Sequence, residues 1–192
     1  MEFWVFAYGS LMWRPNFVFA ESSPALVEGA HRALCVYSVI HRGTYSAPGL
    51  VLGLDRGGQC QGVAFRVPPP LVQDTRLYLR RRENVTNTYM AAVKDVKLLD
   101  GTGRTVKALC FMVNRHHRQY AGDLPLERQA HLVRRSIGAS GLNIDYVFNT
   151  VEHLRECGVH DVKLERLMAY LGHGISRRRA AMRIEPFSDE DV

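Results

Sequence analysis

The first half of the chain consists mainly of short runs of aromatic and β-branched residues, which predict extended strands. Gly29 is a possible break within the second run, and Arg56–Gly58 predicts a turn. The last strand is expected to stop at residues 68–70, which are all proline, because proline cannot donate a ladder hydrogen bond. The predicted strands are Phe3–Ala7, Ala25–Ile40 (as one or two strands), Leu50–Leu54 and Gly62–Val67.

The middle of the chain predicts one helix followed by a hairpin. The predicted helix is Leu71–Glu83. Prolines 68–70 come directly before it, at the helix N-terminus, where proline is best tolerated. Tyr89–Leu99 and Thr105–Val113 are extended apolar runs. The intervening Asp100–Gly103 is typical of a hairpin turn, so we expect these two runs to pair.

The last third predicts three helices, because its apolar residues recur at spacings of three and four. Gly138 should stop the first helix, Ser140–Asn143 should begin the second, and Asp161 should cap the third. Apolar periodicity is lost after Gly172, which predicts one folded domain over residues 1–172 and a flexible, basic-then-acidic tail over 173–192. The predicted core positions are Leu126, Ala130, Val133 and Ile137, then Ile144, Val147, Phe148, Val151 and Leu154, then Leu164, Leu167, Met168 and Leu171.

Composition and charge limit the classes of partner. The 192 residues are 46% apolar and 23% charged, which is ordinary for a soluble globular protein. A net charge of +6 is compatible with nucleic-acid binding or with a site for a small anion. The arginine runs 80–82, 134–135 and 177–179 lack the interleaved aromatic residues of a base-stacking surface. We therefore expect a small-molecule ligand and no nucleic-acid partner.

The sequence shows no secretory signal and no apolar run of membrane-spanning length, so the cytosol is the expected location and no membrane partner is expected. Its pattern is compatible with a monomer or a homodimer. Adjacent His116 and His117 point to different faces of a strand or helix, and we interpret them as surface residues and not as metal ligands. The four cysteines are widely spaced and are predicted to be reduced core residues: Cys35, Cys60, Cys110 and Cys157.

A small-residue loop follows the first predicted strand and is the first candidate site. Its backbone N–H groups lie beyond the strand, Gly9 permits close approach of a ligand, and Ser10 adds a hydroxyl. Such a loop suits a carboxylate or a developing oxyanion, although a simple turn is the alternative. A second glycine- and proline-rich loop, His41–Gly49, carries the positive charge of Arg42 beside Gly43.

Glu83 is the candidate acid or base. Val72, Leu79 and Glu83 are separated by seven and four residues, so they share one face of the predicted helix. A carboxylate at the end of an apolar stripe is costly unless it is paired or protonated. The alternative is a structural ion pair, because Arg76 falls on the same stripe and arginines 80–82 precede Glu83.

Seven pieces of sequence occur in an ordered series: Tyr8–Trp13, Arg42–Thr44, Ala47–Leu54, Gly62–Val67, Arg82–Glu83 with Tyr89, Tyr120–Gly122 and Ser140–Tyr146. In this order and spacing the chain resembles the ChaC branch of the γ-glutamylcyclotransferases, the glutathione-specific branch, over about residues 3–171. The resemblance implies an α+β fold in which helices surround a small closed barrel of mixed strands. It also implies a lyase that converts glutathione to 5-oxoproline and cysteinylglycine without a metal or organic cofactor.

The resemblance further implies roles for individual residues. Glu83 would be the catalytic acid/base. It would take a proton from the substrate's α-amine, and burial should raise its pKa toward that of the amine. The arginines before it would oppose this shift, and we expect them to point away. The substrate-binding candidates are Tyr8, Gly9, Ser10 and Leu11 in the first loop, together with Arg42, Tyr89, Tyr120 and Tyr146.

The chain departs from the family pattern in three places. Asn87 and Thr88 precede Tyr89 where small residues are frequent, Met90–Ala91 follows it where many bacterial members have Arg-Pro, and Arg14–Asn16 stands where Asn-Pro-Gly is common. Because the segment from Glu83 to Tyr89 is expected to border the pocket, a cyclotransferase for other γ-glutamyl amines or amino acids stays open as an alternative. A second alternative is a non-catalytic binding or regulatory protein of the same fold.

Overall fold

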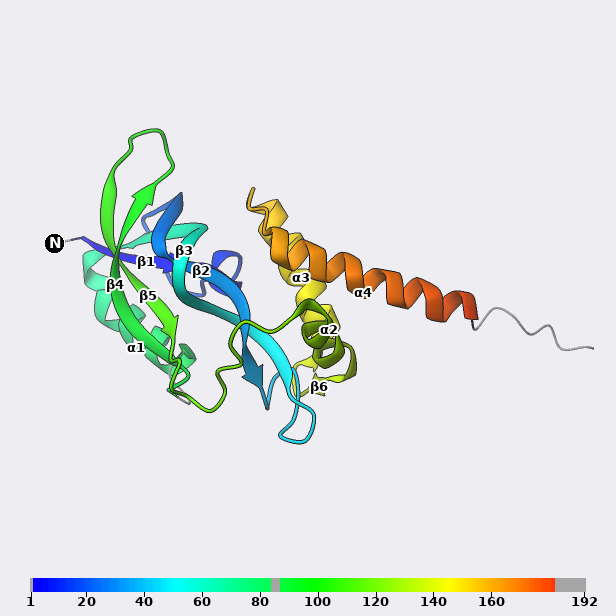
Figure 1. The fold of residues 1–192 in the computed structure, drawn as a ribbon. Helices are drawn as coiled ribbons and strands as arrows, with labels where there is room; N and C mark the ends of the chain where they lie inside the picture. The colour runs from blue at the N-terminus through cyan, green and yellow to red at the C-terminus, as the bar shows by residue number, and fades with distance from the viewer. Residues whose placement is uncertain (1, 84–86, 182–192) are drawn as a thin grey trace, which may run out of the picture.

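The computed structural model describes residues 2–83 and 87–181, the last nine of these by their backbone alone. Within this part of the chain, five strands close into a barrel in the order β1-β3-β2-β4-β5, and β1 pairs with β5 in parallel to close it (Figure 1). The strands are β1 Phe3–Ala7, β2 Glu21–Ser38, β3 Gly49–Val67, β4 Tyr89–Leu98 and β5 Thr105–Val113. The helices are α1 Val72–Glu83, α2 Leu126–Arg135, α3 Asn143–Glu156 and α4 Val162–Ala181.

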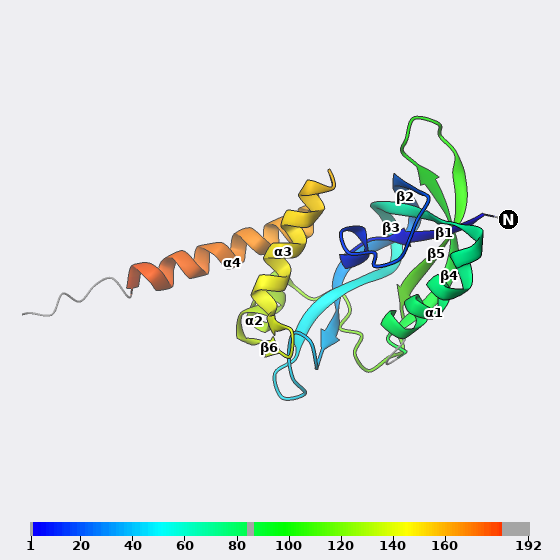
Figure 2. The same ribbon diagram turned by 180° about the vertical axis from the view of Figure 1, so that it is seen from behind.

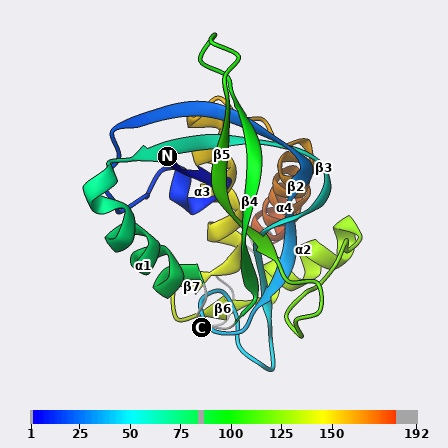
Figure 3. The same ribbon diagram turned by 90° about the vertical axis from the view of Figure 1, so that its left-hand side faces the viewer.

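The long β2–β3 ribbon links the barrel to the helices. The barrel and α1 lie at one end of the molecule, and α2, α3 and α4 gather at the other end, around the far part of the ribbon (Figure 2). Seen from the barrel end, the barrel strands stand in front, α1 covers one side, and α3 and α4 lie behind (Figure 3). The ribbon therefore places one end of the barrel against the helical layer.

The predicted turn at Arg56–Gly58 is wrong, because β3 runs through it as one strand. Gly57 and Gly58 have φ angles of 94° and 69°, which glycine adopts at no steric cost. They absorb a register shift opposite Gly29 of β2, so the two strands pair on both sides of the irregularity. Gly29, with φ of 70°, is likewise a bulge position within one continuous strand.

Two apolar cores explain why the first strand is apolar at every position. Trp4 and Phe6 point into the barrel, where they pack with residues from the other strands, while Val5 and Ala7 face the helical layer. All four side chains are at most 1% exposed. The buried, unpaired thiols of Cys35, Cys60 and Cys110 confirm their prediction as core residues, and Cys157 is half-buried and unpaired.

The helices agree with their predictions, with two exceptions. α1 and the β4–β5 hairpin have the expected positions, and Asp161 caps α4 by accepting a hydrogen bond from the Leu164 N–H at 3.2 Å. Ile137 does not continue α2 as predicted. It lies 58% exposed in a short strand, β6 Ile137–Gly138, which pairs with β7 Gly141–Leu142. α4 also continues beyond Gly172, as far as Ala181. The division into a folded domain and a flexible tail at this point stays a prediction.

Candidate active site

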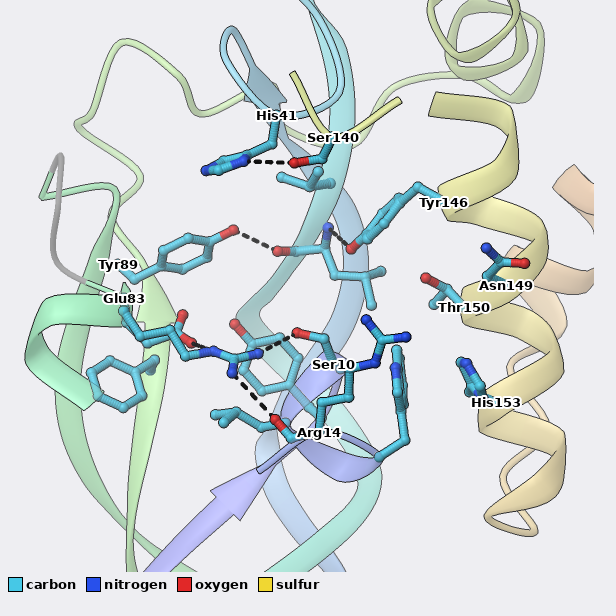
Figure 4. A pocket seen from close by; sticks show the side chains of 18 of the residues that line it. Ser10, Arg14, His41, Glu83, Tyr89, Ser140, Tyr146, Asn149, Thr150 and His153 are labelled. Atoms are coloured by element: carbon cyan, nitrogen blue, oxygen red, sulfur yellow. Dashed lines mark hydrogen bonds and ion pairs between the residues drawn. The ribbon is translucent and has the colours of Figure 1, made fainter. Parts of the chain in front are cut away.

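A cavity of about 580 Å³ lies where the barrel meets the helical layer. The first loop, the end of α1, the start of β4 and one face of α3 contribute polar side chains to it (Figure 4). Of the nine predicted site residues, eight line this cavity: Tyr8, Gly9, Ser10, Leu11, Arg42, Glu83, Tyr89 and Tyr146. Segments far apart in the sequence thus meet at one place.

The first loop leaves β1 and becomes a single 3-10 turn, Ser10–Met12. The first N–H groups of such a turn have no acceptor within it. Among the described residues, no acceptor is bonded to the N–H of Ser10 or Leu11. Buried Arg32 holds the start of the loop, because its Nε donates to the Tyr8 carbonyl and its Nη1 lies 3.3 Å from Asp161 Oδ2. The loop therefore presents two N–H donors from a supported backbone.

Glu83, the last residue of α1, enters the cavity beside this loop (Figure 4). The expectation that the preceding arginines point away is wrong for Arg82. Its Nε lies 3.2 Å from Glu83 Oε1, and its Nη2 donates to Ser10 Oγ at 2.8 Å. The Arg82 guanidinium also donates to the Tyr78 hydroxyl and the Arg14 carbonyl. It reaches all these groups because the helix ends at the cavity rim.

Burial determines the net proton affinity of Glu83. Removal from water raises the pKa of its carboxyl, and the Arg82 guanidinium opposes this through its charge and its hydrogen bond. The pKa remains raised because burial is the larger effect. Glu83 is therefore better matched to exchanging protons with an amine than an exposed glutamate is.

Two tyrosines hold the backbone of β3 against the cavity. The Tyr89 hydroxyl donates to the Leu52 carbonyl at 2.7 Å, and the Tyr146 hydroxyl accepts from the Leu52 N–H at 3.1 Å. Burial raises the pKa of both tyrosines and of Tyr8, so all three stay neutral near pH 7. Tyr89 and Tyr146 thus position the wall, and their ring edges line the space beside it.

Arg42 reaches the cavity because three backbone segments pack closely. A Cβ on Gly43 would lie 2.2 Å from Gly49 N, and one on Gly138 would lie 2.5 Å from the Ile40 carbonyl. The Arg42 Nη1 donates to the carbonyls of Ser140 and Leu142. Its Nε and Nη2 have no hydrogen-bond partner among the described residues, so one edge of the guanidinium is available to a carboxylate.

Tyr120 does not line the cavity. Its segment forms a bridge with Val36, and its hydroxyl donates to Asp55 Oδ2 at 2.7 Å. Arg115 Nε lies 2.6 Å from the other Asp55 oxygen. Tyr120 therefore belongs to a polar cluster around the buried Asp55 of β3, outside the cavity, and this placement does not support its predicted contact with substrate.

One face of α3 adds three cavity residues that were not predicted from the sequence: Asn149, Thr150 and His153. With the predicted Tyr146 they are spaced i, i+3, i+4 and i+7, so the four lie on one helix face (Figure 4). Apart from Tyr146, only the apolar stripe of this helix was predicted. A search for polar residues at helical spacing beside it would have found this second face.

The charged groups of the cavity wall favour an anionic ligand. Among the described residues that line it, the formal charges are those of Arg14, Arg42 and Arg82 and of one carboxylate, Glu83. Among the described residues, no group of three histidine, cysteine, aspartate or glutamate side chains could hold a metal ion. None of the described helices has the length and apolar character needed to cross a membrane.

Comparisons with known proteins give a consistent result. The sequence model of the family described as ChaC-like protein matches residues 3–173. The Escherichia coli K12 glutathione-specific γ-glutamylcyclotransferase is 36% identical over 165 residues, which cover 86% of this chain and 71% of the relative. The Arabidopsis thaliana γ-glutamylcyclotransferase 2-3 is 31% identical over 92% of both chains. The crystal structure of a glutathione-specific γ-glutamyl cyclotransferase from yeast superposes with a TM-score of 0.79 at 22% identity, over 90% of this chain and 96% of that one, which confirms the fold.

Proposed function

This chain belongs to the ChaC-like family, and from that premise we propose that it cyclises the γ-glutamyl group of glutathione, releasing 5-oxoproline and cysteinylglycine. The observation that carries the proposal is the position of Glu83. Its largely buried carboxylate lies beside the backbone N–H groups of Ser10 and Leu11, in a cavity whose described lining also includes the guanidinium groups of Arg14, Arg42 and Arg82. We further propose that the reaction takes place in the cytosol.

The reaction needs little more than positioning and proton transfer. The nucleophilic α-amine and the γ-carbonyl belong to one molecule, so a cavity that holds the folded conformer supplies much of the rate enhancement. Glu83 accepts a proton from the amine nitrogen as that nitrogen bonds to the γ-carbonyl carbon. Glu83 then donates a proton to the amide nitrogen of the cysteinyl residue as the old carbon–nitrogen bond breaks. Water is neither consumed nor produced.

The neighbouring groups have matching roles in this proposal. The N–H groups of Ser10 and Leu11 stabilise the oxyanion that forms when the carbonyl carbon becomes tetrahedral. The available edge of Arg42 binds the α-carboxylate of the γ-glutamyl group by charge-assisted hydrogen bonds. Tyr89 and Tyr146 hold the Leu52 peptide and flank the substrate. The partly buried ring of Tyr8 packs against the core and supports the start of the loop.

Replacement of Glu83 by glutamine tests the proposal. The variant keeps the size of the side chain but cannot exchange a proton, so turnover of glutathione should fall by at least about a hundredfold. The measurement follows 5-oxoproline and cysteinylglycine together, which should appear in equal amounts from the wild type. Glu152→Gln, at an exposed position of α3, is the matched control and should retain full activity.

Three other results would point to different functions. Turnover of other γ-glutamyl compounds but not of glutathione would overturn the assigned substrate and keep the assigned cyclisation reaction. Binding of glutathione without turnover by the wild type would indicate a binding protein of the same fold. Undiminished turnover in Glu83→Gln would show that another group transfers the proton.

A further inference from the structure

The cavity has polar side chains that the chemistry assigned to Glu83 does not use. We call Arg14, Asn149 and His153 the distal group. Figure 4 shows Asn149 and His153 on α3, across the cavity from Glu83. Arg14 follows the first loop and lines the same space.

Arg14 differs from the other two cavity arginines in its contacts. The Arg82 guanidinium is bonded to Glu83, Ser10, Tyr78 and the Arg14 carbonyl, and the Arg42 guanidinium is anchored on two carbonyls. Among the described residues, the Arg14 guanidinium has no hydrogen bond or ion pair. It is a cation that faces a cavity and has its full donor capacity available to a ligand.

His153 is held so that one ring nitrogen is used and the other is available. Its ring stacks on Trp13 with centroids 4.8 Å apart, and its Nδ1 lies 2.8 Å from Glu156 Oε2. The Nε2 therefore remains for a ligand. Asn149, one helical turn earlier, makes no side-chain hydrogen bond to the described residues, so its amide is also available.

We propose that the distal group binds the C-terminal carboxylate of the peptide that leaves the γ-glutamyl group. This inference rests on the proposed function, because it takes the orientation of the substrate from Glu83. With the α-amine at Glu83 and the α-carboxylate at Arg42, the cysteinylglycine part of glutathione extends away from both groups. Its only remaining formal charge is the terminal carboxylate, and Arg14 is the cavity cation that has no partner within the described chain.

The distal group thereby determines the class of substrate. A γ-glutamyl peptide with a free terminal carboxylate gains charge-assisted hydrogen bonds there, whereas a γ-glutamyl amine or an esterified peptide leaves the guanidinium unpaired. Energy from this remote contact raises kcat/KM when it helps to hold the reactive conformer. The chain should therefore prefer γ-glutamyl peptides with a free C-terminus.

A cycle of two enzymes and two substrates tests the proposal. The substrates are glutathione and its glycyl monoethyl ester, which keeps the amine and the scissile bond but lacks the terminal charge. The wild type should favour glutathione in kcat/KM by about tenfold or more, the usual effect of losing a charged hydrogen bond. In Arg14→Gln this ratio should fall to within about twofold of unity. The ratio does not depend on the fraction of folded enzyme, since both substrates meet the same preparation.

The matched control is Arg80→Gln, which removes the same charge from an exposed position outside the cavity and should keep the wild-type ratio. An unchanged ratio in Arg14→Gln, or a wild type that does not distinguish the two substrates, would overturn the distal group as the carboxylate site. Failure of the wild type to release 5-oxoproline from either substrate would instead overturn the proposed function.

Discussion

The two sides of the cavity differ in how firmly their polar side chains are held. On one side, Glu83 is paired with Arg82, and the hydroxyl of Tyr89 is bonded to the backbone of β3. On the other side, Arg14 and Asn149 have no side-chain partners among the described residues. Groups that transfer protons or stabilise developing charge must be oriented before reaction. Groups that bind the far end of a flexible substrate can be oriented by the substrate itself.

The difference also has a cost in stability. A buried carboxylate and buried hydroxyls need partners, and the bonds of Arg82, Tyr89 and Tyr146 supply them. Exposed groups such as Arg14 and Asn149 remain solvated without partners. Substitutions on the two sides should consequently differ in their effects on folding as well as on catalysis.

The largest effect on the firmly held side, apart from loss of Glu83 itself, should come from Arg82→Met. Arg82 lowers the pKa of Glu83 against the effect of burial, so its removal should let that pKa rise. The base form of Glu83 is then lost at a higher pH, and the acid limb of the profile of kcat/KM against pH should move upward. Loss of the bond to Ser10 should also lower kcat/KM at neutral pH by about tenfold or more.

Arg81→Met is the control for this change, because Arg81 is exposed on the same helical turn and does not line the cavity. Its pH profile should match that of the wild type. A profile of Arg82→Met whose acid limb stays in place would show that Arg82 does not influence the proton affinity of Glu83 during turnover.

Tyr146→Phe and Asn149→Ala, on the same helix, compare a cavity side chain that is hydrogen-bonded to the backbone with one that has no side-chain partner among the described residues. Phenylalanine would leave the N–H of Leu52, a residue only 5% exposed, without its acceptor. We expect a loss of about 1–3 kcal/mol in the free energy of unfolding, measured by urea denaturation. Asn149→Ala should change it by less than about 0.5 kcal/mol. Equal losses in the two variants would contradict the stabilising role of the hydrogen bond between Tyr146 and Leu52.

Most of the fold follows from periodicity in the sequence. β1, α1 and the β4–β5 hairpin end within about one residue of their predicted bounds, because each is bounded by glycine or proline or by a change of period. The error at Arg56–Gly58 has a physical cause. A glycine pair with positive φ serves a bulge as well as a turn, and the partner strand that decides between them is distant in sequence.

The candidate site was predictable where a residue's own segment determines its direction. Glu83 faces the cavity as its helical spacing indicated, whereas the contact of Arg82 with Glu83 depends on where α1 ends against the first loop. Tyr120 was grouped with the site because its segment belongs to the family resemblance, but its hydroxyl is bonded to Asp55. Pairing between distant segments decided both outcomes, and sequence spacing within one segment does not contain that information.

The smallest expected effect concerns the stability of Glu83→Gln. Burial raises the pKa of Glu83 in the folded protein above its unfolded value of about 4.3, so the folded state favours the protonated carboxyl. The carboxyl's contribution to stability is complete below that unfolded value and is lost as the pH rises through the folded pKa. Glutamine stays neutral, so the variant should unfold at a slightly higher temperature than the wild type at pH 7. The difference should disappear toward pH 4, and Glu152→Gln should show no such trend in thermal unfolding scans. A less stable Glu83→Gln at pH 7 would mean that the bond with Arg82 outweighs the cost of burying the charge, and the firmly held side would then stabilise the fold as well as the reaction.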